Sequence, residues 1–362
     1  MKIFFDGHIF VDQIFGGISR YFSQLVSSLN RIDNVNAKII APLYRNVYLS
    51  QSNASRFGIK VSHTLRTGRL SWIALKNLSP IVSTFERPDI IHETYFHHNV
   101  ILPGRKKRVT TVYDMIHEKY FPDSETILAK QKSLERCDHI FCISKNTQKD
   151  LCEIYNFPME KTSVTYLSFK NFSSFNNNNL TGFNNNKPYI LYVGNRSFYK
   201  NFIRLLKAVS YSKILIKDFN IIAFGGGKFT DEEKQSIKDL KLDKKNIIQI
   251  TGDDKLLGQA YANATVYVNT SKYEGFGIPP LEAMSSGCPV ICSNTSSLPE
   301  VVGNAAMTFN PNSSEELKFN IEKMILDNTL RTFFINKGFK QIKKFTWEKC
   351  ALKTHEIYRS IL

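Results

Sequence analysis

The sequence lacks the features that mark membrane-spanning and secreted proteins. It has no uninterrupted apolar run of ~18 residues, the length that a transmembrane helix needs. Its first residues, MKIFFDGHIFVDQIFGG, place Asp6 and Asp12 inside the apolar stretch, which is not the pattern of a signal peptide. We therefore expect a cytoplasmic protein whose chain starts with a β-strand.

The sequence also lacks the cysteine spacing of common zinc sites. No two of its six cysteines form a Cys-x-x-Cys pair. Scattered core thiols in a reducing compartment explain them best. They are Cys137, Cys142, Cys152, Cys288, Cys292 and Cys350.

Negative charge is scarce, because 32 Asp and Glu face 48 Lys and Arg, giving a net charge of +16. Residues 1–170 hold 23 Lys and Arg against 15 Asp and Glu, and residues 171–362 hold 25 against 17, so the excess is even. Such a balance favours an anionic partner: nucleic acid, a membrane surface or a phosphorylated substrate. The even distribution and the absence of a basic stretch interleaved with aromatics argue against nucleic acid.

The densest basic cluster, Gly104–Arg108, allows two interpretations. It is either a solvated turn before a strand or a contact with anionic lipid headgroups. A second basic and amphipathic segment, Arg66–Phe85, is either a packed surface helix or a helix at a bilayer interface. We expect peripheral contact with an anionic membrane at the inner face of the cytoplasmic membrane.

A length of 362 residues predicts two domains. The Asn-rich stretch 171–187 is too poor in core residues to order itself and is expected to be the linker. We expect an N-terminal Rossmann-like domain over 1–170, a C-terminal Rossmann-like domain over 188–344, and a C-terminal helix over 345–362 that packs back on the first domain.

Short apolar segments alternate with helical patterns in both halves. This alternation predicts an α/β protein of two Rossmann-like, doubly wound parallel-sheet domains that face each other across a cleft. Ser144 is expected to cap the helix that follows it. The predicted strands are Lys2–Phe5, Ala37–Ile40, Ile90–His92, Arg108–Tyr113, His139–Ile143, Tyr189–Val193, Asn220–Phe224, Ile247–Ile250, Thr265–Asn269 and Val290–Cys292.

The stretch YEGFGIPPLEAM, at residues 273–284, combines two carboxylates with glycines and prolines. Glycines allow positive φ in a loop, and a proline in the first turn of a helix loses no hydrogen bond. Gly287 suits the position just after the helix. The pattern predicts a strand–loop–helix–strand unit, with Glu274 on the loop and Glu282 in the first helical turn.

Ligands of open parallel sheets bind beyond the carboxyl ends of the strands, where this loop is expected to lie. Backbone amides at a helix N-terminus suit a pyrophosphate, and each carboxylate suits a vicinal diol. A nucleotide sugar has a pyrophosphate for the amides, a ribose diol for one glutamate and sugar hydroxyls for the other. In the alternative interpretation, Glu282 complements the helix dipole and Glu274 caps the loop.

Two further segments follow predicted strands. Arg196 and Lys200 could neutralise a departing diphosphate, an electrostatic contribution of ~3 kcal/mol for one well-placed donor. The alternative is a pair of solvated charges. Gly225 and Gly226 would let backbone approach a flat nucleobase, or form a plain flexible turn.

The segment TSKYEGFGIPPLEAMSSGCPVICSNTSSLPEVVGNAA resembles the signature of family-4 glycosyltransferases, and ILYVGNRSFYKNF, FCISKNTQKDL and FTWEKCALKTHEIY also resemble that family. Family members have two Rossmann-like domains in the arrangement called GT-B. They retain the anomeric configuration and need no bound metal or other cofactor. The resemblance implies that Glu282 binds the ribose and Glu274 the donor sugar. It also implies a UDP-, GDP- or dTDP-sugar donor and a glycan or lipid-linked glycan acceptor.

The resemblance further implies donor contacts from backbone segments. The amides of Phe276, Gly277 and Ile278 would face the sugar and phosphate, and the turn at Gly16 and Gly17 would approach the donor phosphates.

On the acceptor side, the family often has a histidine where this chain has Tyr113. A tyrosine cannot copy imidazole proton chemistry near neutral pH. Asp114 is then the candidate that orients or deprotonates the acceptor, with His92, His97 and His117 as substitutes. The neighbouring histidines lack metal-site spacing, and we expect no metal.

The sequence as a whole predicts a retaining, metal-independent glycosyltransferase of bacterial surface polysaccharide synthesis. Glu274, Arg196, Lys200 and Asp114 are its predicted catalytic residues. Two alternatives stay open: a nucleotide-sugar epimerase on the same scaffold, and a non-catalytic basic protein that binds membrane or nucleic acid.

Overall fold

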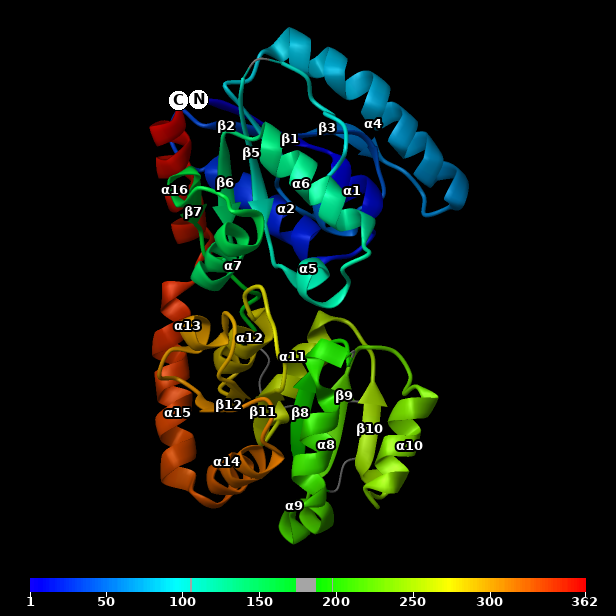
Figure 1. Ribbon diagram of the computed structural model, residues 1–362, viewed down its shortest axis with the longest axis vertical. Coiled ribbons are helices and arrows are strands. Elements are labelled where there is room, and N and C mark those ends of the chain that lie inside the picture. Colours follow the sequence, from blue (N-terminus) through cyan, green and yellow to red (C-terminus); the bar gives the residue numbers. More distant parts are fainter. Residues whose placement is uncertain (105, 174–186, 197) are drawn as a thin grey trace. The chain divides into compact units, whose positions relative to one another are not determined.

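The computed structural model describes residues 1–104, 106–173, 187–196 and 198–362 (Figure 1). The predicted linker, 171–187, lies mostly outside these ranges. The chain forms two compact units: unit 1 comprises Met1–Ser168 and Thr346–Leu362, and unit 2 comprises Phe169–Phe345. Each unit contains one sheet, and its strand pairs are parallel. The predicted α/β class with two doubly wound domains is confirmed.

Unit 1 has the strand order β3-β2-β1-β4-β5-β6-β7. Its strands are β1 (Lys2–Asp6), β2 (Asn36–Tyr44), β3 (Arg56–Lys60), β4 (Ile90–Glu93), β5 (Lys107–Val112), β6 (His139–Cys142) and β7 (Thr162–Val164). Its helices are α1 (His8–Asp12), α2 (Gly17–Leu29), α3 (Val47–Gln51), α4 (Leu65–Glu86), α5 (Ile116–Tyr120), α6 (Glu125–Arg136), α7 (Lys145–Tyr155) and α16 (Trp347–Ile361).

Unit 2 has the strand order β10-β9-β8-β11-β12-β13. Its strands are β8 (Tyr189–Val193), β9 (Asn220–Phe224), β10 (Ile247–Ile250), β11 (Val266–Asn269), β12 (Val290–Ser293) and β13 (Met307–Phe309). Its helices are α8 (Phe202–Ser210), α9 (Lys213–Asp218), α10 (Asp231–Asp239), α11 (Asp254–Asn263), α12 (Ile278–Ser285), α13 (Leu298–Val302), α14 (Ser314–Leu326) and α15 (Asn328–Gln341).

The strand order reverses between β1 and β4 in unit 1 and between β8 and β11 in unit 2. At such a point the loops that leave neighbouring strands run to opposite faces of the sheet, and a crevice opens at the carboxyl ends. Each unit therefore has one edge position at which a ligand site is expected.

Helices cover both faces of the sheet of unit 1. Successive side chains of a strand point to opposite faces, so neighbouring residues of β1 show what covers each face. Phe4 belongs to a buried cluster with Leu75 of α4, whereas the next residue, Phe5, packs on Phe22 of α2. Trp347, at the start of α16, lies with its ring centroid 6.2 Å from that of Tyr21 in α2. The C-terminal helix is therefore part of unit 1.

Local signals in the sequence explain several element ends. The Ser144 side chain accepts a hydrogen bond from Thr147 N, so the predicted cap of α7 is confirmed.

Strands β3, β7 and β13 were not predicted. Among the described residues, no helix combines the length and the apolar character needed to cross a bilayer.

Candidate active site

The segment around the two glutamates forms the predicted strand–loop–helix–strand unit between β11 and β12. Gly277 caps α12 with φ of 102°, and a Cβ there would lie 2.8 Å from Leu298 Cδ2. A larger residue would therefore be strained in both backbone and packing. Gly287, with φ of 71°, follows the helix as predicted.

Glu274 is held firmly at the strand reversal of unit 2. Lys200 Nζ lies 2.8 Å from both carboxylate oxygens, and Ser271 Oγ donates to Oε1 at 2.7 Å. The backbone is fixed too, since Glu274 N donates to Ser296 Oγ and Ser297 Oγ donates to the Glu274 carbonyl. Lys200 comes from the segment after β8 and Glu274 from the loop after β11. The fold therefore brings these two predicted residues together, although they are 74 positions apart.

Glu282 lies deeper than the sequence suggested. It is the fifth residue of α12 and belongs to the second turn, which corrects the predicted first-turn position. Only 6% of its surface is exposed, and Tyr261 Oη donates to Oε2 at 3.2 Å. Burial, together with the Glu282 charge, raises the pKa of Tyr261, so this phenol stays a donor to the carboxylate.

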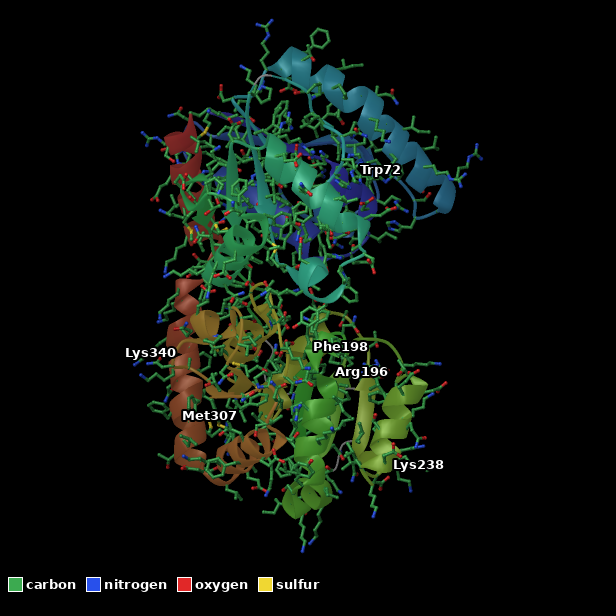
Figure 2. All side chains as sticks on the ribbon, viewed as in Figure 1. Trp72, Arg196, Phe198, Lys238, Met307 and Lys340 are labelled. Carbon is green, nitrogen blue, oxygen red and sulfur yellow. The ribbon has the colours of Figure 1, made fainter. Side chains whose placement is uncertain are left out.

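Arg196 organises the glycine turn after β9. Its Nε lies 2.7 Å from Glu233 Oε1, and its other nitrogens donate to the carbonyls of Gly225, Gly226, Gly227 and Lys228. Arg196 lies on the segment that follows β8 (Figure 2). Its side chain is 3% exposed. The structure thus gives Arg196 a structural role, and the diphosphate contact stays a prediction.

Gly225 and Gly226 require glycine for their backbone. Their φ angles are 83° and 69°, and a Cβ on Gly226 would lie 2.7 Å from Arg196 Nη1 and 2.9 Å from the Gly194 carbonyl. The turns after β8 and β9 are therefore closely packed. The predicted nucleobase contact at this position is not tested by the geometry.

The remaining donor-side predictions are placed as follows. Phe276 is buried with its ring centroid 5.6 Å from that of Phe345, and Ile278 begins α12. Gly16 caps α2 with an extended backbone, and a Cβ added to Gly17 would meet no atom within 4 Å. The phosphate contacts predicted for Gly16 and Gly17 stay predictions.

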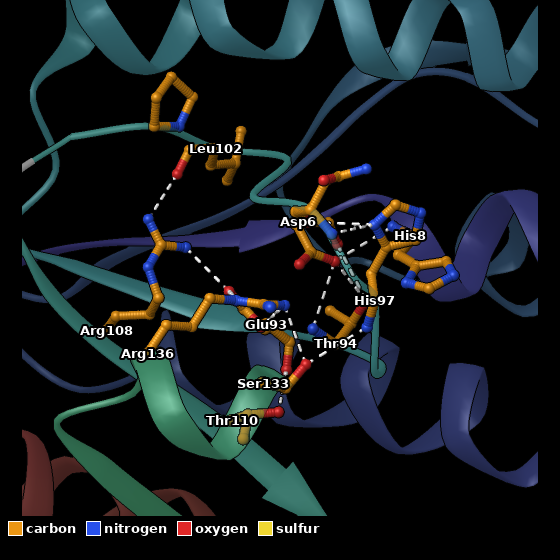
Figure 3. A network of polar contacts seen from close by, with 12 residues as sticks. Asp6, His8, Glu93, Thr94, His97, Leu102, Arg108, Thr110, Ser133 and Arg136 are labelled. Carbon is orange, nitrogen blue, oxygen red and sulfur yellow. Dashed lines mark hydrogen bonds and ion pairs between the residues drawn. The ribbon is translucent and has the colours of Figure 1, made fainter. Parts of the chain in front are cut away.

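A polar network lies at the strand reversal of unit 1 (Figure 3). Asp6 ends β1, and its Oδ1 accepts hydrogen bonds from Thr94 Oγ1 at 2.6 Å, Thr94 N and His8 N. Burial raises the pKa of Asp6. These bonds tie the segment after β1 to the segment after β4.

Four aromatic rings gather beside that network; we call them the aromatic group. His8 lies 5.0 Å from Trp72, 5.6 Å from Tyr95 and 5.1 Å from His97 between ring centroids. Asp12 orients two of the rings, since its oxygens bond His8 Nε2 at 3.0 Å and Trp72 Nε1 at 3.1 Å. His8 Nδ1 is buried and has no hydrogen-bond partner among the described residues.

Sequence reasoning did not select His8, Trp72 or Tyr95. The DGH triplet that follows the first predicted strand could have pointed to His8, because residues after β1 and β4 meet at the reversal. Trp72 carries no such signal, since it comes from the middle of α4.

His92 is a core residue, which corrects its predicted place on the acceptor side. It has no exposed surface, and its ring bonds Thr111 Oγ1 at 2.8 Å and the Tyr358 hydroxyl. Burial lowers its pKa from 6.5 to about 3, so the ring is neutral at physiological pH. It points to the face of the sheet that α2 and α16 cover.

The other acceptor-side predictions follow β5. Tyr113 is buried and donates to the Thr94 carbonyl at 2.8 Å. Asp114 is partly exposed, and its Oδ1 accepts from Ile116 N at 3.0 Å. His117 lies in α5, and its buried Nδ1 has no hydrogen-bond partner within the described ranges. Asp114 and His117 are both partly exposed, whereas Tyr113 is buried.

In the basic cluster Gly104–Arg108, two cations form ion pairs within unit 1. Arg108 is buried and pairs with Glu93 at 3.0 Å, and Arg136 binds the same carboxylate at 2.7 Å (Figure 3). A buried carboxylate that pairs with two guanidinium groups is structural, since losing one partner would leave buried charge. Lys107 pairs with Asp138 at 3.5 Å.

The comparisons with known proteins agree with this geometry. Residues 174–341 match the model of glycosyl transferases group 1, and residues 15–167 match that of glycosyltransferase family 4. The chain is 28% identical to O-antigen chain mannosyltransferase B of Escherichia coli, over 95% of this chain and 96% of the relative. It is also 28% identical to O-antigen chain mannosyltransferase RfbU of Salmonella typhimurium, over 83% and 84%.

The chain is a group 1, family 4 glycosyltransferase. Its fold is GT-B: the Anabaena HepE structure in complex with UDP-glucose superimposes with a TM-score of 0.71, at 17% identity, covering 99% of this chain and 100% of that one. The matches favour sugar transfer over the two alternatives that the sequence left open.

This glycosyltransferase shows, within its described residues, no group of three or more His, Cys, Asp or Glu side chains placed to hold a metal ion. Independence of metal stays a prediction.

The six cysteines are free and mostly buried, and burial raises the pKa of Cys292 and Cys350 to about 12. Their thiols are therefore poor nucleophiles.

Proposed function

We propose that this glycosyltransferase moves mannose from a nucleotide diphosphate sugar to a glycan acceptor with retention of anomeric configuration. The acceptor is lipid-linked and belongs to the synthesis of a bacterial surface polysaccharide. The observation that carries the proposal is the Lys200–Glu274 pair at the strand reversal of unit 2. The printed names of the two mannosyltransferase relatives support the choice of sugar.

Unit 2 holds the donor in this proposal. Glu274 accepts hydrogen bonds from hydroxyls of the sugar, and Lys200 fixes the carboxylate and adds positive charge beside the diphosphate. Glu282 binds the ribose diol from the bottom of the site, with Tyr261 donating to its second oxygen. Preorganised groups of this kind act without reorganising during the reaction.

The chemical step replaces one bond to the anomeric carbon with another. The bond from that carbon to the diphosphate oxygen breaks, and a bond from an acceptor hydroxyl oxygen forms on the same face. The diphosphate leaves with the electron pair and takes the acceptor proton. The protein supplies binding and electrostatics, and no cofactor takes part.

Unit 1 holds the acceptor glycan. The rings of Trp72, Tyr95 and His97 are partly exposed, and aromatic faces suit the apolar faces of sugars. His8 Nδ1 provides a polar group beside them, and Asp114 contacts the acceptor hydroxyl. A lipid-linked acceptor also brings the enzyme into peripheral contact with the cytoplasmic membrane.

A panel of nucleotide sugars tests the donor. UDP-, GDP- and dTDP-sugars are screened for thermal stabilisation, because a ligand at 100 times its Kd adds about 2.7 kcal/mol. We expect one mannose nucleotide to stabilise the protein and Glu282→Gln to remove the effect. Glu315→Gln, at an exposed position of α14, is the matched control and should keep it.

The product then tests the reaction. Transfer with the stabilising donor should give a glycosidic bond with the donor's anomeric configuration, read by NMR. An inverted product would contradict retention. Formation of an epimeric sugar nucleotide without acceptor would contradict transfer itself.

A further inference from the structure

A buried ion pair lies against the segment that carries Asp114. Lys130 Nζ lies 2.8 Å from Glu118 Oε1 and 3.0 Å from Oε2, and the two side chains are 1% and 6% exposed. Lys130 belongs to the buried side of α6, together with Ala129 and Leu134. Lysine is almost never fully buried, and an apolar residue is the ordinary occupant of such a position. The pair therefore needs an explanation beyond the packing of α6.

The ammonium group of Lys130 also binds the backbone of the segment after β5. Its Nζ donates to the Asp114 carbonyl at 2.9 Å, while Asp114 Oδ1 accepts from Ile116 N at 3.0 Å. Helix α5, which begins there, has five residues and no side-chain cap at its N-terminus, and a helix this short is not stable by itself. Lys130 thus attaches the backbone at Asp114 to the neighbouring helix α6 (Figure 1).

The same cluster reaches two further elements of unit 1. Tyr155, the last residue of α7, donates from Oη to Glu118 Oε1 at 2.6 Å. Burial and the Glu118 carboxylate raise the pKa of Tyr155, so the phenol stays a donor. Lys130 Nζ lies 5.1 Å from the ring centroid of Phe96, which follows Tyr95 of the aromatic group. The cluster therefore joins the segments after β4 and β5 to α6 and α7.

Stability alone does not explain this arrangement. Taking an ammonium and a carboxylate out of water offsets much of their attraction, and buried pairs can often be replaced by apolar residues without loss of stability. The hydrogen bonds of such a pair do fix one placement of the groups around it. Here the fixed group is the backbone of the residue that presents a carboxylate to the acceptor in the proposed reaction.

We propose that Lys130 is a positioning residue of the transfer reaction: through the Asp114 carbonyl and Glu118, it holds the Asp114 carboxylate where the acceptor hydroxyl binds. The inference rests on the proposed function, in which Asp114 contacts that hydroxyl. Lys130 is buried and does not itself touch substrate. A reacting group displaced by ~1 Å can slow a reaction ~10²-fold, because the groups must meet in one geometry.

A double variant, Lys130→Met with Glu118→Gln, tests the proposal. It removes both charges together, so no buried charge is left alone, and the glutamine keeps an acceptor for Tyr155. We expect kcat for transfer to fall ~10-fold or more, while the unfolding midpoint in denaturant stays near that of the wild type. Thermal stabilisation by the donor should be unchanged, because Glu274 and Glu282 are untouched.

A double-mutant cycle with Asp114→Asn separates positioning from general structural support. If Lys130 acts through Asp114, the loss of kcat caused by the Lys130→Met, Glu118→Gln pair should largely disappear in the Asp114→Asn background. An effect on the structure as a whole would instead multiply with the effect of Asp114→Asn. The cycle therefore gives a readout that a merely structural role would not produce.

The matched control is Lys132→Met with Glu135→Gln. This ion pair, with Lys132 Nζ 3.1 Å from Glu135 Oε2, lies on the same helix at exposed positions, and its loss should leave kcat like the wild type. A second, milder variant is Glu118→Gln alone, which keeps the size of the side chain and leaves Lys130 in place. It should lower kcat in the same direction as the double variant but by a smaller factor.

Four results would overturn the proposal. They are a folded double variant with wild-type kcat, a loss of kcat that multiplies with that of Asp114→Asn, an Asp114→Asn enzyme as active as the wild type, and loss of folding in both the double variant and Glu118→Gln. The last would show a structural role. The proposed function fails separately, through the donor panel and the product of the wild-type enzyme, so the two failures are distinguishable.

Discussion

The two strand reversals of the molecule differ in how their site residues are encoded. In unit 2, Glu274, Gly277 and Glu282 come from one continuous segment, and Lys200 is the addition from a distant one. In unit 1, Asp6, His8, Trp72 and His97 come from three separate segments. A local motif can encode the first kind of site, whereas only the fold assembles the second.

This difference leads to unequal expectations for mutation. Changes in unit 2 should act on the donor and on the chemical step, because its residues are fixed around one loop and helix. Changes to His8 and the rings around it in unit 1 should act on the acceptor and not on the donor. The following predictions test that division, starting with the largest effect.

Glu274→Gln should lower kcat/KM for transfer by ~10³-fold. The substitution removes the negative charge that Lys200 holds in place, and it weakens hydrogen bonds that stabilise the transition state. Losing one preorganised group of this kind usually lowers the rate by about 10²- to 10³-fold. Steady-state kinetics with the donor found in the panel measures this. Glu315→Gln should behave like the wild type, and a Glu274→Gln enzyme within twofold of wild-type activity would refute the role.

Arg196→Ala should lower the free energy of unfolding by about 3 kcal/mol, because it leaves Glu233 and several turn carbonyls without their buried partner. Denaturant unfolding measures this through the midpoint at unchanged slope. Lys234→Ala, which removes a solvent-exposed ion pair with Asp231, should leave the unfolding midpoint nearly unchanged.

Arg196 also decides between two interpretations. A variant with unchanged stability and abolished transfer would favour the diphosphate contact predicted from the sequence. A destabilised variant that still transfers sugar would favour the structural role that the hydrogen bonds indicate.

His92→Gln should change how stability depends on pH. The folded ring has a pKa of about 3, whereas the unfolded ring has an ordinary value near 6.5. The unfolded state therefore binds the proton first, and wild-type stability should fall as pH drops from 6.5 towards 3, at up to ~1.4 kcal/mol per pH unit from this group.

The pH series is measured as the difference between wild type and variant, because other groups titrate in the same range. Asp6, with its raised pKa, acts in the opposite direction. The difference should shrink to a constant above pH 6.5. A variant as acid-sensitive as the wild type would contradict the buried, neutral state of His92, and His63→Gln, at an exposed position, is the control.

His8→Ala should raise the acceptor KM by ~10-fold while leaving the donor KM unchanged, since one polar contact to a hydroxyl is worth about 1 kcal/mol or slightly more. Initial rates with each substrate varied in turn measure this split. His63→Ala should change neither constant. An equal rise in donor KM would break the proposed division between the units.

The sequence predicted the parallel-sheet class and the strands Tyr189–Val193, Asn220–Phe224 and Ile247–Ile250 to the residue. Buried parallel strands are continuous apolar runs bounded by polar segments, and such runs can be recognised in a sequence. The edge strand β3 was missed because Arg56–Lys60 is mostly exposed and lacks that run.

The site residues were also predicted correctly only where the local sequence determines the backbone. The Glu274 loop was placed correctly because glycine and proline report backbone geometry directly. Glu282 was set one turn too early, since helix starts are uncertain from sequence. His92 was misplaced because sequence position after an apolar pair does not reveal which face of β4 a side chain occupies.

The most direct test of the account is a crystal structure of the protein with the stabilising nucleotide sugar. We predict that the sugar hydroxyls contact Glu274 and the ribose hydroxyls contact Glu282, beside the strand reversal of unit 2. A donor bound elsewhere, with neither carboxylate in contact with it, would contradict the account.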